Sequence, residues 1–153
     1  MAISNLQICP NCGERLSASK NPALTVDVII ETVSEDVDSI ILIKRKNPPY
    51  GWAIPGGFVD YGESVEHAAI REAKEETNLD ITLIKLLGVY SDPQRDPRGH
   101  TVSVVYIVKG RGQAKADDDA VELGYYTQKN LPDDLVFDHK RIISDYFRIR
   151  NIA

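Results

Sequence analysis

Short apolar runs rich in β-branched residues alternate with polar stretches that contain proline or glycine, a pattern typical of strands joined by turns. Residues 24–33 (LTVDVIIETV) predict one strand. The nearly continuous apolar run at residues 39–44 (SIILIK) predicts a strand buried on both faces. Further extended segments are predicted at residues 52–59, 83–89, 101–108 and 121–126. Much of the backbone is therefore expected to form a sheet.

The hydrophobic period changes to that of a helix in the stretch SVEHAAIREAKEET. Val65, Ala69 and Ala73 recur at every fourth position, and such small residues favour close packing of a helix against a sheet. Ser64 precedes them as a candidate N-cap. Asn78 follows them, and asparagine tolerates the left-handed conformation that often ends a helix. We therefore predict a loop–helix unit in this stretch.

A second amphipathic helix is predicted at residues 139–150, where Ile142, Ile143, Tyr146 and Phe147 fall on one face. Strands flanked by two helices indicate an α/β (α+β) fold class. The architecture expected is a mixed sheet in an α/β/α sandwich.

The composition fits one globular domain preceded by a short extension. The chain has 153 residues, of which 42% are hydrophobic and 27% charged, so it is long enough to bury a core. We expect residues 1–22 to form an irregular lead-in and residues 23–153 to form the domain.

The charge balance narrows the class of partner. A net charge of −5 argues against polymeric nucleic acid, which needs a basic surface. It leaves room for a small anionic substrate, because divalent cations bridge acidic proteins to phosphate. The sequence has no apolar run near the length of about 20 residues that spans a bilayer. Its first residues, MAISNLQICPNC, lack the basic and apolar regions of a signal peptide, so we expect a cytoplasmic protein without a membrane partner.

The two cysteines, Cys9 and Cys12, lie in the stretch CPNCG, which resembles one knuckle of a zinc ribbon. A structural zinc ion needs four ligands, usually from two knuckles, and the second knuckle is missing here. Zinc would require distant ligands or a second subunit. We therefore favour a reduced turn over a zinc site.

The stretch REAKEE places three carboxylates, those of Glu72, Glu75 and Glu76, on one face of the predicted helix. Like charges at this spacing destabilise a helix by about 0.2–0.5 kcal/mol per pair. A hard divalent cation such as Mg²⁺ would relieve this repulsion, and the backbone at Gly56 is placed to offer it a carbonyl. The alternative is a solvated acidic helix with no metal.

The stretch from Gly57, GFVDYGESVEHAAIREAKEETNL, extends this pattern. Gly57 is followed by five residues, Glu63, seven residues and then REAKEETNL. This spacing resembles the signature of the Nudix hydrolases, with Asn78 where the family has glycine. The resemblance implies a Nudix-type α/β/α sandwich with a loop–helix catalytic motif. It also implies Mg²⁺ or Mn²⁺ as cofactor and hydrolysis of a nucleoside diphosphate linked to another moiety.

The resemblance assigns roles within this motif. Arg71 and Glu63 would orient the loop and the helix. The metal ligands implied are Gly56, Glu72, Glu75 and Glu76. The general base stays open: it comes from the motif or from a distant loop, where Asp118 and Asp119 are the best candidates. These two aspartates equally fit an additional metal ligand or a polar turn before a strand.

The segment after the motif, SDPQRDPRGH, resembles the ADP-ribose pyrophosphatase branch of the family, in which a proline follows the motif, as Pro93 and Pro97 do here. The branch implies cleavage of ADP-ribose to AMP and ribose 5-phosphate. Candidate substrate contacts are Arg45, Trp52, Arg95, Arg98, His100 and Asp118, with Tyr90 and Phe137 as further aromatic residues to stack on adenine. The alternatives for these residues are a salt-bridged surface loop and core packing.

Two other functions compete with this one. The same chemistry fits NADH, another nucleotide sugar or an oxidised nucleoside triphosphate as substrate. A non-catalytic nucleotide-binding regulatory domain is the alternative from another class, although such domains usually lose the motif glutamates that are present here. A homodimer is expected, formed through the C-terminal helix or a strand edge.

Overall fold

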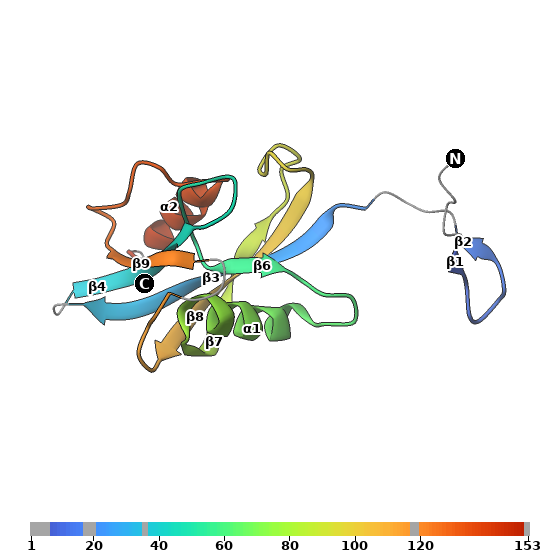
Figure 1. The fold of residues 1–153 in the computed structure, drawn as a ribbon, viewed down its shortest axis with the longest axis horizontal. Coiled ribbons are helices and arrows are strands. Elements are labelled where there is room, and N and C mark those ends of the chain that lie inside the picture. Colours follow the sequence, from blue (N-terminus) through green and yellow to red (C-terminus); the bar gives the residue numbers. More distant parts are fainter. Residues whose placement is uncertain (1–6, 17–20, 35–36, 117–119, 152–153) are drawn as a thin grey trace.

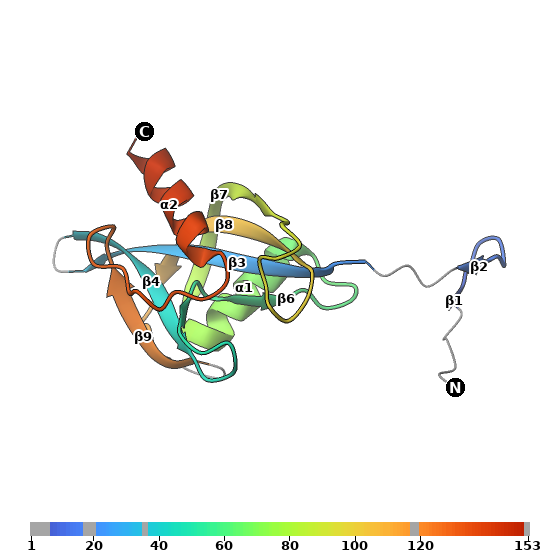
Figure 2. The same cartoon turned by 90° about the horizontal axis from the view of Figure 1, so that it is seen from above.

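The computed structural model describes residues 7–16, 21–34, 37–116 and 120–151, and its main body is a mixed sheet with a helix on each face (Figures 1 and 2). The strands of this sheet are β3 (Ala23–Ser34), β4 (Val37–Arg45), β5 (Trp52–Ala53), β6 (Gly56–Phe58), β7 (Asp80–Tyr90), β8 (Thr101–Arg111) and β9 (Ala120–Tyr126). The helices are α1 (Val65–Thr77) and α2 (His139–Arg150). The predicted α/β/α sandwich is confirmed.

The sheet has the strand order β5-β4-β3-β8-β7, with β6 paired to β3 and β9 paired to β4. Strands β3 and β8 run parallel, and the other pairs are antiparallel. The long central strand β3 therefore contacts β4, β6 and β8, and it is the element around which both faces of the molecule are built.

Alternate residues of β3 face opposite sides of the sheet. Val26 packs in one cluster with Ala69 and Ala73 of α1, whereas Ile29 packs in another with Ile142 of α2. Ala69 and Ala73 of α1 are fully buried and Val65 is partly buried, because short side chains let the helix lie close to the sheet. Two separate apolar layers thus hold the helices in place.

Both helices begin and end where the sequence indicates. The Ser64 hydroxyl accepts a hydrogen bond from the His67 N–H at 3.2 Å and caps α1. Asn78 ends this helix with a φ of 60° and donates its N–H to the Lys74 carbonyl. The second predicted helix has the observed bounds of α2, and its four predicted apolar residues are buried.

Several strands differ from their predicted bounds. Strand β7 begins three residues early and β8 ends three residues late, because Asp80 pairs with Arg111 at the end of their shared ladder. The predicted segment 52–59 is divided into β5 and β6 by Ile54 and Pro55. The bounds of β7 and β8 depend on a partner distant along the chain, which the sequence pattern does not show. The division at Pro55 does have a sequence signal, since proline has no N–H to donate to a strand ladder.

The described part of the N-terminal lead-in contains a short hairpin of β1 (Gln7–Ile8) and β2 (Arg15–Leu16), where an irregular segment is expected. Cys9 donates its N–H to the Glu14 carbonyl, and Gly13 donates to the Cys9 carbonyl, both at 2.9 Å. Cys9 and Cys12 are free thiols. No helix among the described residues is long and apolar enough to cross a membrane.

Candidate active site

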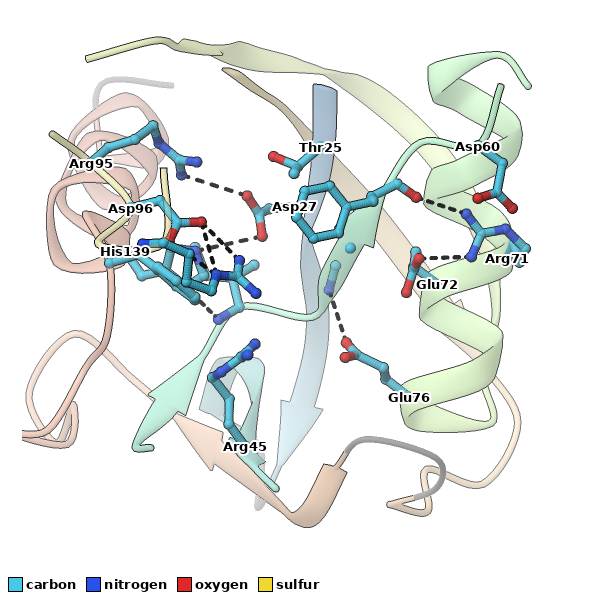
Figure 3. A pocket seen from close by; sticks show the side chains of 16 residues that line it. Thr25, Asp27, Arg45, Asp60, Arg71, Glu72, Glu76, Arg95, Asp96 and His139 are labelled. Carbon is cyan, nitrogen blue, oxygen red and sulfur yellow. Dashed lines mark hydrogen bonds and ion pairs between the residues drawn. The ribbon is translucent and has the colours of Figure 1, made fainter. Parts of the chain in front are cut away.

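A cavity of about 260 Å³ lies between α1 and the start of α2 (Figure 3). Its floor comes from β3 and β6, and the loop at residues 91–100 forms part of its wall. Eight of the residues predicted from the sequence line it: Arg45, Gly56, Arg71, Glu72, Glu76, Arg95, Arg98 and Phe137. The fold therefore brings the motif helix and the downstream arginines to one place.

Glu76 is the most enclosed carboxylate on the helix side, with 5% of its surface exposed. Its Oε2 accepts a hydrogen bond of 2.9 Å from the Gly56 N–H. Burial raises the pKa of Glu76 to about 8, and repulsion from Glu72 and Asp27 adds to the rise. A carboxylate in this position gains strongly from a nearby cation, which would stabilise its charged form.

This pKa leads to a prediction about the metal-free protein. A carboxyl group with a raised pKa holds its proton more tightly in the folded chain than in the unfolded chain. Its contribution therefore favours folding at low pH and is lost as the pH rises from its ordinary pKa of 4.5 to about 8. We expect Glu76→Gln to gain stability relative to wild type between pH 4.5 and pH 8, measured by urea unfolding in EDTA. If the difference in free energy of unfolding between the two proteins is the same at pH 4.5 and pH 8, the raised pKa of Glu76 is contradicted.

Glu72 lies one turn before Glu76 and faces the same cavity (Figure 3). Burial raises its pKa, and this rise is opposed by Arg71, whose Nη1 lies 2.7 Å from Oε1. A Cβ atom built at Gly57 would overlap the Glu72 carboxylate, so a larger residue there would displace this side chain. The motif glycine thus allows the backbone of β6 to lie directly against this carboxylate.

Arg71 joins the motif loop to the helix. It donates two hydrogen bonds of 2.9 Å to the two carboxylate oxygens of Glu63 and a third, of 3.0 Å, to the Phe58 carbonyl. These contacts, with His67, lower the pKa of Glu63 to about 2. Glu75 lies 3.4 Å from Arg71 with its side chain 44% exposed, and it does not line the cavity. The geometry fits the orienting roles predicted for Arg71 and Glu63.

The donor set suits a magnesium ion that binds together with substrate. Among the described residues, no three His, Cys, Asp or Glu side chains gather closely enough to form a complete metal site. Mg²⁺ is commonly bound by one or two carboxylates, with water and substrate phosphates as the other ligands. Glu72 and Glu76 supply two enclosed carboxylates with raised pKa values on one wall. They therefore fit such an ion.

The arginines of the 91–100 loop are held by aspartates. Arg95 donates to both carboxylate oxygens of Asp138, at 3.1 and 2.6 Å, and its side chain is only 3% exposed. Arg98 pairs with Asp96 in the same two-pronged manner. The guanidinium groups are therefore fixed before any ligand binds.

Phe137 forms an aromatic part of the cavity wall between two arginines. The guanidinium carbons of Arg45 and Arg98 each lie 5.1 Å from its ring centroid, and Arg98 also lies 5.4 Å from the ring of Phe58. Phe137 has a φ of 56°, which is rare for a bulky residue and is found mainly where surrounding structure enforces it. This strained backbone places the ring at the cavity.

Other predicted residues lie elsewhere. Trp52 is buried in the core, where its ring meets that of Tyr126 edge-on at 5.1 Å. Tyr90 is also in the core, with its hydroxyl bonded to Asp145. His100 is exposed and contacts the Ser91 carbonyl. None of the three predicted residues lines the cavity, and Asp118 and Asp119 lie outside the described residues.

Several residues of the cavity escaped the sequence analysis, and among them are the ion-paired Asp27, Asp96 and His139. Asp27 carried a detectable signal, since it is the one charged residue in the run LTVDVII of a predicted buried strand. His139 carried none, because a histidine at a helix start is unremarkable. It is brought to Asp27 only by the packing of α2 on the sheet.

Comparison with known proteins places the chain in a family. A family model described as NUDIX domain matches residues 22–146. An ADP-ribose pyrophosphatase of Methanocaldococcus jannaschii is 52% identical over 134 residues, which cover 86% of this chain and 76% of the relative. The chain therefore belongs to the Nudix family of hydrolases, as its motif and fold indicate.

Two further relatives connect the fold with ADP-ribose. The solved NUDIX domain of Shewanella oneidensis NrtR, complexed with ADP ribose, has a TM-score of 0.78 at 27% identity, with 87% of this chain and 91% of that chain covered. An ADPR responsive transcriptional repressor NtrR of Acinetobacter baylyi is 31% identical over 139 residues. This match covers 86% of our chain but only 56% of the repressor, so the chain spans about half of that protein.

Proposed function

We propose that the protein hydrolyses ADP-ribose to AMP and ribose 5-phosphate with the help of Mg²⁺ or Mn²⁺. The observation that carries the proposal is the pair of enclosed carboxylates, Glu72 and Glu76, beside the Gly56-Gly57 backbone in a cavity that also holds arginines. The 52% identity to an ADP-ribose pyrophosphatase supports the choice of substrate.

Glu72 and Glu76 would hold the divalent ion. When bound, such an ion neutralises pyrophosphate oxygens and lowers the pKa of a bound water. Glu75 and the Gly56 backbone remain candidate additional ligands, although the Gly56 N–H already serves to orient Glu76. Arg71 keeps the loop and the helix in register through Glu63. Asp118 and Asp119 stay our candidates for the general base.

Substrate recognition is assigned to the opposite wall. The arginines there provide positive charge toward a pyrophosphate, and the Phe137 ring provides a flat apolar surface next to them. Because Arg95 is enclosed and bonded to Asp138, we give it a supporting role and expect Arg45 and Arg98 to make the direct contacts.

A substrate panel tests this function. We expect kcat/KM with Mg²⁺ to be at least about 10-fold higher for ADP-ribose than for NADH, ADP-glucose, diadenosine polyphosphate or 8-oxo-dGTP, a ratio that a few pocket contacts can supply. A clear preference for one of the other compounds would keep the pyrophosphatase chemistry and overturn the assignment of substrate.

A regulatory domain is the second candidate, favoured by the similarity to the NtrR repressor. A regulatory role for this chain predicts tight binding of ADP-ribose without AMP release in the presence of Mg²⁺. The complete set of motif glutamates argues for turnover instead. A cytoplasmic location and a homodimer remain predictions.

A further inference from the structure

His139, the first residue of α2, forms part of the cavity wall and is 2% exposed. Its Nδ1 accepts a hydrogen bond of 2.9 Å from the Ile54 N–H. A ring nitrogen that accepts from a backbone amide cannot carry a proton, so the neutral ring has its proton on Nε2. That nitrogen lies 3.5 Å from Oδ1 of Asp27. Burial, which lowers the pKa of His139 to about 3, agrees with a neutral ring.

Asp27 fixes the other side of the ring. Its carboxylate accepts a hydrogen bond from the Ser103 hydroxyl of β8 and lies 3.9 Å from the Arg95 guanidinium. It projects from the same face of β3 as Ile29, toward α2. The imidazole is therefore held between a strand of the sheet and the backbone of Ile54 (Figure 3).

The segment at residues 54–56 is attached to three different elements. Ile54 donates to His139 of α2, and the Pro55 carbonyl accepts from the Val28 N–H of β3 at 2.8 Å. Gly56 then donates to Glu76 of α1 at 2.9 Å. Just before this segment, the backbone of Trp52 forms hydrogen bonds with the backbone of residues 134–136. From there on, the His139 ring supplies the hydrogen bond between the segment and the start of α2, while the Ile54 side chain packs in the same apolar cluster as Ile142.

We infer that His139 is a positioning residue for the metal ligand Glu76. His139 fixes the backbone position of Ile54 and thereby the backbone path of Pro55 and Gly56. This path determines the direction from which the Gly56 N–H donates to the Glu76 carboxylate. This inference rests on the proposed function, because it requires Glu76 to bind the ion. His139 would act only through the backbone, with no proton transfer of its own.

Two conservative variants separate this role from simple packing. In His139→Asn, the amide oxygen can take the place of Nδ1 and accept from Ile54. In His139→Gln, the polar group reaches the place of Nε2, near Asp27, and Ile54 loses its acceptor. We expect His139→Gln to weaken Mn²⁺ binding, measured by electron paramagnetic resonance, by about 10–100-fold, the usual range for groups that orient a metal ligand. His139→Asn should stay close to wild type.

The outcomes are distinguishable from those of the proposed function. Wild-type Mn²⁺ affinity in a folded His139→Gln protein, together with weak binding in Glu76→Gln, would overturn the role of His139 alone. Equal affinity in wild type and Glu76→Gln would overturn the metal assignment and this inference with it. A His139→Asn protein as defective as His139→Gln would also overturn the inference.

A measurement on the wild-type protein does not depend on the folding of any variant. The ¹⁵N chemical shifts of the His139 ring report which nitrogen carries the proton. We expect a protonated Nε2 and an unprotonated Nδ1 from pH 5 to pH 8, since the Ile54 N–H occupies Nδ1. A proton on Nδ1 in this range would contradict the bond to Ile54 and overturn the inference.

Discussion

Glu76→Gln should lower kcat for ADP-ribose by about 10³-fold, which corresponds to about 4 kcal/mol of lost transition-state stabilisation. Glutamine has nearly the same shape and keeps an oxygen that can accept from the Gly56 N–H. It lacks the negative charge that holds a divalent cation. The fold should therefore survive while turnover is lost.

Steady-state kinetics at saturating Mg²⁺ measures this effect, and far-UV circular dichroism checks the fold. Glu66→Gln is the matched control, because Glu66 lies on the same helix, is exposed and does not line the cavity. Its contact with the Tyr106 hydroxyl needs only an acceptor, which glutamine retains. Near wild-type turnover in Glu76→Gln would show that the metal is held elsewhere.

Removal of divalent cations should abolish turnover altogether. Glu72 and Glu76 present negative charge to a negatively charged pyrophosphate, and a divalent cation between them would neutralise both. We expect no AMP release in excess EDTA and full recovery when Mg²⁺ or Mn²⁺ is added in excess of the chelator. Full activity in EDTA would refute the proposed mechanism.

The same titration has a readout that is independent of activity. A ligand that binds only the folded state raises the melting temperature in proportion to the logarithm of its concentration. Mn²⁺ should therefore raise the melting temperature of the wild type and have much less effect on Glu76→Gln. An equal rise in both proteins would indicate binding away from Glu76.

The helices and most strands could be predicted because hydrophobic periodicity and capping residues are visible within a short stretch of sequence. The stripe of Val65, Ala69 and Ala73, with caps at Ser64 and Asn78, is complete within one stretch of sequence. The exact ends of β7 and β8 were not predictable, since they depend on pairing between strands distant along the chain. Element type thus followed from periodicity, and element length from tertiary contacts.

The candidate site divides in the same way. The carboxylates Glu72 and Glu76 share a helix face by spacing alone, so sequence reasoning placed them on one wall. Asp27 and His139 belong to a wall assembled from distant segments, and no spacing rule relates them. Trp52 was predicted as a substrate contact but lies in the core. The sequence does not distinguish an aromatic residue that lines a site from one that fills a core.

The most direct test of ADP-ribose hydrolysis by this protein is product analysis by chromatography after incubation of the protein with ADP-ribose and Mg²⁺. We predict AMP and ribose 5-phosphate in equal amounts, formed by wild type and by Glu66→Gln but not by Glu76→Gln. ADP-ribose that stays intact in the presence of wild-type protein and Mg²⁺ would contradict this prediction, and tight binding of that intact nucleotide would favour the regulatory domain.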